Sequence, residues 1–593
     1  MATYIPYTPT GTIESALFNL DAFGTPNYKS TGTVSVSVSD SFTKAEYLSS
    51  SFPLSADIYT SLVSGSGGWT PAQLANIDLI TTTYSNFINL KFSQVSDKSG
   101  STPTNVASGT DINISFIYRP DWPHAGQSAG GVDDNFGYPG SNGDIILNWY
   151  GFGSSGLNNN KSLSSTSFGF HALMHEIGHS LGLAHPHRST ASGTRAITAD
   201  YAATTAVGFD KLGFQTGSPL DMDKEYFSVM SYDDQEIAGA ADTFAQTPMI
   251  LDVIALQGAY GEGGGTSGTG NDVIKPGSLS GVAAYRTYFD TGGTDTVDLS
   301  NYASGAYLNL GTTIDGAAHL VGVSMSADDE NKLVVLKRDP SSLRWFYGEY
   351  ENASGSAADD HMLGNSLDNS INGESGNDLL EGKEGKDAIS GGLGNDTLNG
   401  GPGNDSLDGG AGIDTAVFNG DRFDYALTKA GTALGIRDNR GDSGMDCLDG
   451  IERLEFSNAK LAVDLDATQS GGEAALLIGA LTGKASLSDK ALVGVLLKYF
   501  DAGNTLLDAA NVLVGAGIID RLANQTSTSA FVNLIYRNIV GREATAAVTQ
   551  DLAALIDGRI YTKAGLLAAA ATLPENQVNV GLIGLQQTGL EYS

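Results

Sequence analysis

The sequence predicts a multidomain protein with a mixed α/β (α+β) domain, then a parallel β-roll, then a small all-α C-terminal domain. With 593 residues, 41% of them hydrophobic, the chain is too long for a single hydrophobic core. Helical and alternating apolar patterns occur before about residue 261, a nine-residue repeat follows, and helical spacing returns near residue 472. We therefore expect four parts: an N-terminal segment (1–55, with a propeptide as one interpretation), the mixed domain (56–261), the repeat region with flanking strands (262–471) and the helical domain (472–593).

The apolar pattern changes from helical to alternating within the first two parts. Thr70-Pro71 reads as the N-cap and first position of a helix. Apolar residues recur after it at helical spacing: Leu74, Ile77, Ile80, Tyr84 and Phe87. Alternating or continuous apolar runs predict strands at 33–39, 112–116 and 144–149. A helix among such strands is typical of an α/β or α+β domain.

Residues 364–417 form six consecutive nonads. Each begins with glycine, at Gly364, Gly373, Gly382, Gly391, Gly400 and Gly409. Position six is acidic or amide: Asn369, Asp378, Asp387, Asp396, Asp405 and Asp414. Position eight is small or aliphatic: Ile371, Leu380, Ile389, Leu398, Leu407 and Ala416. Glycine permits tight turns and the eighth residue fills a thin core, so this period is typical of a parallel β-roll. A disordered linker would not keep an aliphatic residue in that register.

The aspartates at position six predict calcium sites. Carboxylate oxygens are the ligands that Ca²⁺ prefers, and stacked carboxylates repel one another without a cation. We therefore expect Asp378, Asp387, Asp396, Asp405 and Asp414 to bind several structural calcium ions, with folding coupled to binding. The net charge of −35 agrees with this expectation and argues against a nucleic-acid partner.

Strand-like and then helical patterns follow the repeats. Val417-Phe418 and Tyr425-Ala426-Leu427 read as strands. Two helices are expected further on, one capped by Ser488 and one capped by Ser529 with Gly541 past its end.

Five of the eight histidines lie between His171 and His187. On a helix, His175 and His179 would face one ion, and Glu176 beside them would contact a bound water. A turn at Gly182 would bring His185 back as a third ligand, leaving one position open, as a catalytic Zn²⁺ requires. Since the ligand set is then full, His171 and His187 are expected at the surface or behind the ligands.

This spacing resembles the extended zinc signature of the metzincin proteases. Ser228-Val229-Met230-Ser231-Tyr232 is similar to the methionine turn of that clan. The resemblance places Met230 beneath the zinc and implies that Tyr232 binds zinc or stabilises the tetrahedral intermediate. Pro186 and the run Thr247 to Gly261 resemble the serralysin branch, and the nonads resemble its RTX repeats.

The resemblance implies a secreted, zinc-dependent endopeptidase that cleaves proteins or peptides. Serralysins leave Gram-negative bacteria through a type I secretion apparatus that reads an uncleaved C-terminal signal. The N-terminus lacks a basic and an apolar region of the ordinary secretory kind, which fits that route. We expect a monomer.

Two departures from the serralysin plan leave alternatives open. Residues 325–350 read as an insertion, and the helical part after residue 472 is foreign to the usual plan. One alternative is a calcium-dependent binding protein associated with the cell surface or an S-layer. Another is a protease directed narrowly at one surface partner. Glu176 argues against pure binding, because a protein without hydrolytic activity has no need of that base.

Overall fold

The computed structural model describes parts of the N-terminal half and nearly all of the C-terminal half. The described ranges are 3–7, 27–39, 71–95, 112–117, 144–148, 168–183, 227–231, 244–330 and 343–593, with short gaps at 32, 182, 267, 278–283, 315–318, 431–432 and 442–443. The chain divides into two compact units, Met1–Asn352 and Ala353–Ser593. Each unit is described by itself, and the boundaries expected at residues 55, 261 and 471 stay predictions.

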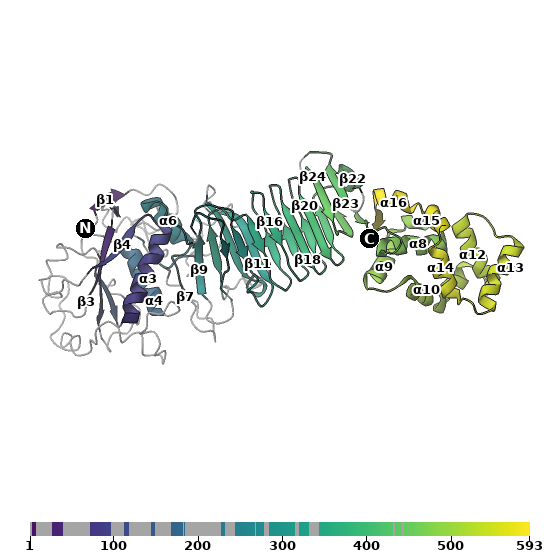
Figure 1. The fold of residues 1–593 in the computed structure, drawn as a ribbon, viewed down its shortest axis with the longest axis horizontal. Helices are drawn as coiled ribbons and strands as arrows, with labels where there is room; N and C mark the ends of the chain where they lie inside the picture. Colours follow the sequence, from purple (N-terminus) through teal and green to yellow (C-terminus); the bar gives the residue numbers. More distant parts are fainter. Residues whose placement is uncertain are drawn as a thin grey trace, which may run out of the picture. The chain divides into compact units, whose positions relative to one another are not determined.

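The first unit contains a four-stranded parallel sheet in the order β4-β3-β5-β6 (Figure 1). Its strands are β3 (Thr33–Ser39), β4 (Lys91–Val95), β5 (Ile112–Ile117) and β6 (Asp144–Asn148). Three of these were expected from the sequence and are confirmed. A separate antiparallel pair joins β1 (Thr3–Tyr7) to β2 (Asn27–Thr31).

Three helices of the first unit are joined by buried hydrogen bonds. They are α3 (Pro71–Phe87), α4 (Phe168–Ser180) and α6 (Ile250–Tyr260). The Tyr84 hydroxyl donates to the Met174 carbonyl at 2.7 Å, which joins α3 to α4. The Gln257 amide donates to the Phe87 carbonyl at 2.8 Å, which joins α6 to α3. The expected start of α3 at Pro71 is confirmed, and Ile77, Ile80, Tyr84 and Phe87 are buried.

A second sheet of the first unit has the order β11-β12-β13-β9-β7. These strands are β7 (Phe244–Ala245), β9 (Ala284–Phe289), β11 (Ala306–Ile314), β12 (His319–Ser326) and β13 (Arg344–Tyr347). The first unit also contains β8 (Val273–Ile274) and β10 (Thr296–Asp298), which pair in parallel in a different sheet, and the short helix α7 (Ala327–Glu330). β13 lies between β12 and β9 and its Trp345 is fully buried, so this part of the expected insertion 325–350 is an interior strand.

In the second unit, successive nonads contribute strands alternately to two parallel sheets (Figure 1). One sheet contains β16 (Ser370–Asn372), β18 (Ala388–Leu393), β20 (Ser406–Ala411) and β24 (Met445–Asp449). The other contains β15 (His361–Leu363), β17 (Leu379–Glu381), β19 (Thr397–Asn399), β21 (Thr415–Phe418) and β25 (Arg453–Phe456). Two antiparallel strands, β26 (Lys460–Ala462) and β27 (Leu590–Tyr592), extend it beyond β25. β14 (Asn352–Ser354) precedes them, and β22 (Tyr425–Ala430) and β23 (Ala433–Asp438) form a hairpin. All six position-eight side chains are buried, as the repeat pattern predicts.

Nine helices lie between β26 and β27. They are α8 (Ser470–Thr482), α9 (Lys490–Asp501), α10 (Leu506–Gly515), α11 (Ile518–Leu522), α12 (Thr528–Val540), α13 (Ala546–Asp557), α14 (Lys563–Ala571), α15 (Pro574–Val580) and α16 (Leu582–Thr588). α8 is buried along nearly its whole length and forms the centre of the core that these helices share. Of the helices that the structure describes, none combines the length and apolarity needed to cross a bilayer.

Both helix caps expected in this segment are wrong by one or two residues. Asp489 caps α9, accepting from the Leu492 amide at 3.1 Å, whereas the Ser488 hydroxyl donates to the Ala485 carbonyl within a preceding 3₁₀ turn. Ser527, not Ser529, caps α12, accepting from the Ala530 amide at 3.2 Å. Serine and aspartate are equally good N-caps, so residue type alone could not choose between neighbours. Gly541 does end α12, with a φ of 77°.

Candidate metal centres

The first candidate centre lies on α4, which carries His175 and Glu176. Both side chains are 4% exposed. His175 Nδ1 lies 2.7 Å from the Val229 carbonyl oxygen. In a neutral imidazole, a proton on Nδ1 that is donated to this carbonyl puts the lone pair on Nε2, and this is the tautomer that a metal ligand needs. The hydrogen bond of His175 therefore fits the predicted role in metal binding.

Asp252 of α6 holds the turn that supplies this carbonyl. The Ser228 hydroxyl donates to Asp252 Oδ1 at 2.6 Å, and the amides of Val229 and Met249 both donate to Oδ2 at 2.8 Å. Burial raises the pKa of Asp252 to about 6, and these hydrogen bonds oppose the rise. Asp252 was not predicted from the sequence, although it is the one carboxylate in the largely apolar run Thr247 to Gly261.

Met230 packs against α4, and His171 is a buried residue of that helix. Met230 is fully buried, and a Cβ added to Gly178 would lie 2.9 Å from its sulfur, so only glycine allows the turn this close to α4. His171 is 5% exposed, and its charge lowers the pKa of Asp252. Of the two places expected for His171, the surface is therefore wrong.

The remaining predicted residues of this centre are described only in part. His179 lies on α4 four residues after His175, and its side chain lies outside the described residues. His185, His187 and Tyr232 also lie outside the described residues. The structure thus brings together His175, Glu176 and Met230, and the other assignments stay predictions.

The second candidate centre is the row of aspartates at position six of the repeats. One carboxylate oxygen of each accepts a backbone amide from the repeat 18 residues earlier, at 2.8–2.9 Å: Asp378 from Asp360, Asp387 from Asn369, Asp396 from Asp378, Asp405 from Asp387 and Asp414 from Asp396. The other oxygen, Oδ2, of these same five aspartates is buried and has no hydrogen-bond partner among the described residues. A buried carboxylate oxygen without a partner is costly, and a cation would satisfy it.

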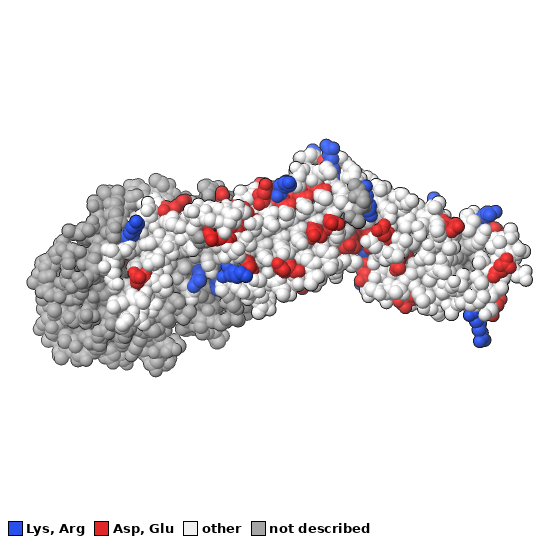
Figure 2. Space-filling view, in the orientation of Figure 1, with Lys and Arg blue, Asp and Glu red and all other residues white. Residues whose placement is uncertain are grey.

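The glycine at position one of the repeat lies next to two oxygen atoms, as Gly373 shows. A Cβ added to Gly373 would collide with Asp378 Oδ2 and lie 2.6 Å from the Gly391 carbonyl oxygen. The carboxylate of one loop and the carbonyl of the loop 18 residues later therefore face the same space. Figure 2 shows several acidic side chains on the visible face of the repeat region. An all-oxygen donor set of this kind suits Ca²⁺.

The aspartates at position six of the repeats have raised pKa values. Burial, with a smaller contribution from neighbouring carboxylates, raises the pKa of Asp378 to about 7 against the opposing hydrogen bond from the Asp360 amide. Burial also raises the pKa of Asp387 to about 7 and of Asp414 to about 6. Bound cations reverse such shifts because they favour the charged form.

The start of the array differs from this row. Asn369 replaces the aspartate in the first predicted nonad, and its amide donates to Asn365 Oδ1 at 2.9 Å. A further repeat, missed in the sequence analysis, precedes it, with Gly355 at position one, Asp360 at six and the buried Met362 at eight. The two oxygens of Asp360 accept from the hydroxyl and the amide of Ser356 at 2.9 and 2.6 Å. The side chains at position six of the first two repeats therefore form hydrogen bonds within their own repeat, whereas Oδ2 of the five aspartates that follow has no partner among the described residues.

Another missed repeat lies beyond the hairpin. After the interruption by residues 418–440, the same residue pattern returns at Gly441, Gly444, Asp446 and Leu448. β24 pairs with β20 in parallel, and Asp446 Oδ1 accepts the Asp405 amide at 3.0 Å. Leu448 is buried. The same residue pattern was present in the sequence, but the interruption hid it.

Three aspartates of the first unit form a third cluster. One carboxylate oxygen each of Asp272, Asp290 and Asp295 lies within 4.8 Å of the others. Asp295 Oδ1 accepts the Asp272 amide at 2.7 Å, while its buried Oδ2 has no hydrogen-bond partner in the part of the chain that the structure describes. Burial and the charge of Asp290 raise the pKa of Asp295 to about 6. These residues were not predicted from the sequence, although Asp272 and Asp295 follow glycines in the manner of the repeats.

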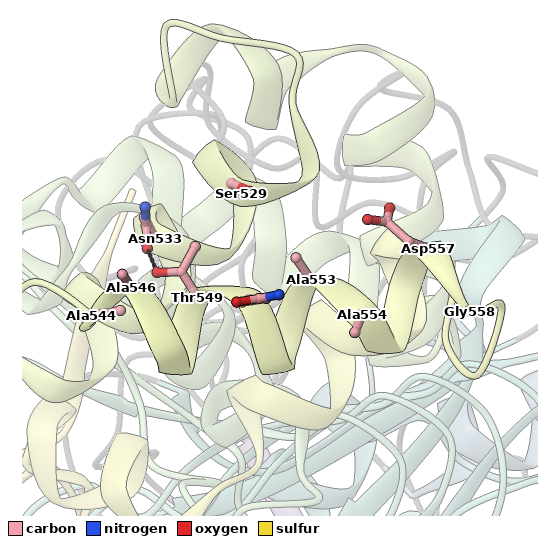
Figure 3. Close-up of a pocket in the computed structure, with 10 residues that line it drawn as sticks. Ser529, Asn533, Ala544, Ala546, Thr549, Ala553, Ala554, Asp557 and Gly558 are labelled. Atoms are coloured by element: carbon pink, nitrogen blue, oxygen red, sulfur yellow. Dashed lines mark hydrogen bonds between the residues drawn. The ribbon is translucent and has the colours of Figure 1, made fainter.

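A pocket of about 880 Å³ lies beside α12 and α13 (Figure 3). Its lining mixes alanines and a glycine with polar side chains, and Thr549 donates to Asn533 Oδ1 at 2.6 Å inside it. Ser529 and Asp557 line it as well. The lining residues include no histidine or cysteine, so this pocket is a less suitable place for a catalytic metal than α4.

Comparison with known proteins identifies the same nine-residue repeat. The family of the RTX calcium-binding nonapeptide repeat (4 copies) matches residues 354–389 and 381–416. Serralysin B of Dickeya chrysanthemi is 27% identical over 284 residues, which is 45% of this chain and 52% of that protein. Metallopeptidase AprA of Pseudomonas marginalis is 28% identical over 317 residues, which is 51% of this chain and 56% of that protein.

A shorter match gives the same picture. Serralysin C of Dickeya chrysanthemi is 31% identical over 185 residues, or 29% of this chain and 34% of that protein. The chain thus spans about half the length of the relatives that it matches over the longest stretches. The matches and the repeat geometry together show that the chain is a serralysin-like protein with RTX calcium-binding repeats.

Proposed function

We propose that this protein is a secreted, zinc-dependent endopeptidase whose repeat region folds around calcium. The observation that carries the proposal is the hydrogen bond of His175 to the Val229 carbonyl, next to the buried Glu176 on α4. In this proposal the first unit contains a metzincin protease domain and the repeats form a parallel β-roll. The similarity to serralysins supports both assignments.

His175, His179 and His185 would hold the zinc. When bound, Zn²⁺ polarises the scissile carbonyl and lowers the pKa of a water in its open position. Glu176 lies beside the first ligand and would accept a proton from the attacking water, then deliver it to the leaving amine nitrogen. Tyr232 would donate a hydrogen bond to the oxygen on which charge develops. Met230 would form the floor of the site.

The backbone and α6 would keep His175 in the correct state for this chemistry. The Val229 carbonyl fixes the tautomer, and Asp252 fixes Val229 by accepting its amide. General acid–base catalysis by a residue such as Glu176 typically contributes about 10²–10⁴-fold to the rate.

Calcium binding by the five position-six aspartates would couple folding to the extracellular medium. The repeats would stay unfolded at low cytosolic calcium and fold after export through a type I apparatus of a Gram-negative cell. The buried Oδ2 atoms support this role, because each needs a cation or a proton when the repeats fold. The substrates would be proteins or peptides, cleaved by a monomer.

Attachment to a cell surface or S-layer is a second candidate function of the helical segment. Val578 and Ile583 are 79% and 78% exposed there, which is unusual for large apolar side chains. If the segment serves targeting, Val578→Ser with Ile583→Ser would abolish association with cells and leave hydrolysis of an unstructured substrate unchanged. Unchanged association would leave the plain endopeptidase as the better account.

Glu176→Ala is the experiment that tests the proposed reaction. Casein cleavage should be lost while metal analysis still finds zinc in the protein, because Glu176 acts on water and is not a ligand. Cleavage by the variant at the wild-type rate would refute the proposed role of Glu176.

A further inference from the structure

The repeat sheets continue beyond the last predicted nonad. β25 pairs with β21 in parallel, with Ala416 opposite Leu454. Leu454 is fully buried, as Ala416 is, so it occupies the place of the position-eight residue. β25 therefore forms one more rung of this sheet, although no glycine-rich nonad leads into it.

Glu452 occupies the place of the position-six aspartate in this rung. The Asp414 amide donates to Glu452 Oε2 at 2.9 Å, just as the Asp396 amide donates to Asp414 Oδ1 at 2.8 Å. The next residue keeps the pattern as well. The Arg453 amide donates to the Asp414 carbonyl at 2.9 Å, in the way that the Thr415 amide donates to the Asp396 carbonyl.

Gly450 occupies the place of the position-one glycine. A Cβ added to Gly409 would collide with the Gly450 carbonyl oxygen and lie 2.8 Å from Asp414 Oδ2. In the preceding rung, the corresponding Cβ on Gly391 would meet the Gly409 carbonyl and Asp396 Oδ2. Only Ile451 separates Gly450 from Glu452, so the loop is shorter, and the longer side chain of glutamate reaches the position that aspartate reaches elsewhere.

One carboxylate oxygen of this rung has no hydrogen-bond partner among the described residues. Asp414 is fully buried, and its Oδ2 is among the atoms without a hydrogen-bond partner in the described structure. It faces the same space as the Gly450 carbonyl, and Glu452 adds a second carboxylate beside it. Carboxylate and carbonyl oxygens of this kind are the ligands that Ca²⁺ selects.

We propose that a calcium ion binds between Asp414 and Glu452, one rung beyond the recognised repeats, and that it stabilises the helical segment through Arg453. The inference rests on calcium binding by the repeats, which is part of the proposed function. It adds a site that the nonad pattern does not contain and gives Glu452 a role as a ligand.

Arg453 supplies the physical link to the helices. Its guanidinium is 4% exposed and donates to Asp464 Oδ1 at 2.6 Å and to Asp501 Oδ1 at 2.5 Å. Asp464 also accepts the Gly471 amide in the first turn of α8, and Asp501 is the last residue of α9. Loss of one partner from a buried ion pair is strongly destabilising. An ion that fixes Glu452 thus also fixes the residue that joins the sheet to α8 and α9.

Calcium stoichiometry of the full-length protein tests the site. Calorimetric titration should find one ion fewer in Glu452→Gln than in the wild type, because the amide still accepts the Asp414 N–H but carries no charge. Glu455→Gln is the matched control, since Glu455 lies three residues later, on β25, and pairs with Lys460 at the surface. Asp396→Asn, within the recognised repeats, should also lose an ion.

The outcomes separate this inference from the proposed function. If Asp396→Asn loses an ion while Glu452→Gln binds calcium like the wild type, the additional site is refuted and calcium binding by the repeats stands. If the wild type binds no calcium, calcium binding by the repeats fails together with the inference.

Hydrogen exchange tests the link through Arg453. In the wild type, calcium should slow the exchange of amides in α8 and α9. In Glu452→Gln with calcium, these amides should exchange about tenfold faster than in the wild type. Arg453→Gln should keep the wild-type number of ions and lose the same protection. Protection of α8 and α9 that does not respond to calcium, or that survives in Arg453→Gln, would refute the link.

Discussion

His175 Nδ1 lies 2.7 Å from the carbonyl oxygen of Val229, a residue 54 positions later in the chain. The contact joins the helix that carries two of the three predicted zinc ligands to the turn that carries Met230. Asp252 holds that turn from the other side through the Val229 amide and the Ser228 hydroxyl. The geometry of a proposed metal ligand therefore depends on a carboxylate that does not touch it.

Asp252→Asn should weaken zinc binding about 10–100-fold, the usual effect of changing a group behind a metal ligand. Asparagine offers one acceptor where the carboxylate offers two, so the turn that holds His175 loosens. Competition with a chromogenic chelator measures the zinc affinity. Asp551→Asn, at an exposed position of α13, is the control. Wild-type zinc affinity in Asp252→Asn would show that this network does not position His175.

Gly178→Ala should lower the free energy of unfolding by about 1–3 kcal/mol, as overpacking usually does. The new Cβ would lie 2.9 Å from the Met230 sulfur and 3.2 Å from the Tyr84 hydroxyl. The matched control is Gly584→Ala in α16, where a Cβ would meet no atom within 4 Å. That change should be neutral or stabilise by about 0.5–1 kcal/mol through helix propensity. Urea unfolding measures both, and equal effects would contradict the close packing of Met230 on α4.

Leu398→Ala should lower the free energy of unfolding of the calcium-loaded protein by about 2–5 kcal/mol, because it removes a fully buried side chain from the thin core of the repeats. Leu379→Ala, at a strand position that is 44% exposed, should change it by less than about 0.5 kcal/mol. Thermal unfolding in millimolar calcium compares the two. Similar losses would mean that position eight is not the core of the repeats.

Without calcium, the repeats should lose stability as the pH rises through about 7. Burial raises the pKa of Asp378 and Asp387 to about 7 in the folded chain, above the value of about 3.9 for an unfolded aspartate. The folded state therefore binds protons more tightly, so its stability is highest below about pH 4 and falls between the two pKa values. Circular dichroism in a calcium chelator should show more β-structure at pH 5 than at pH 8. A larger β-signal at pH 8 would contradict this.

Local patterns predicted the elements that depend on local sequence. Pro71 begins α3, Thr33–Ser39 is a strand, and the residue at position eight of each nonad is buried. Intrinsic conformational propensity and the period of the apolar residues decide these features. The N-cap of α9 was predicted one residue too early. Ser488 and Asp489 are both good N-cap residues, and the position at which α9 begins selects Asp489.

Residues that act through distant partners escaped the sequence analysis. Asp252 holds a turn more than twenty residues away, and Glu452 belongs to a rung whose partner strand lies before an inserted hairpin. Neither relationship has a fixed spacing in the sequence. His171 likewise has the periodicity of its helix but gives no sign of whether its face is covered. Such pairings follow from the three-dimensional fold and not from a local motif.

The zinc content of the purified protein tests the central claim most directly. Elemental analysis of the wild type and of His175→Ala, prepared side by side, should find about one zinc per chain in the wild type and little in the variant. Casein hydrolysis should follow the zinc content. A wild-type protein without stoichiometric transition metal, or a metal content that does not depend on His175, would contradict the proposed zinc centre on α4.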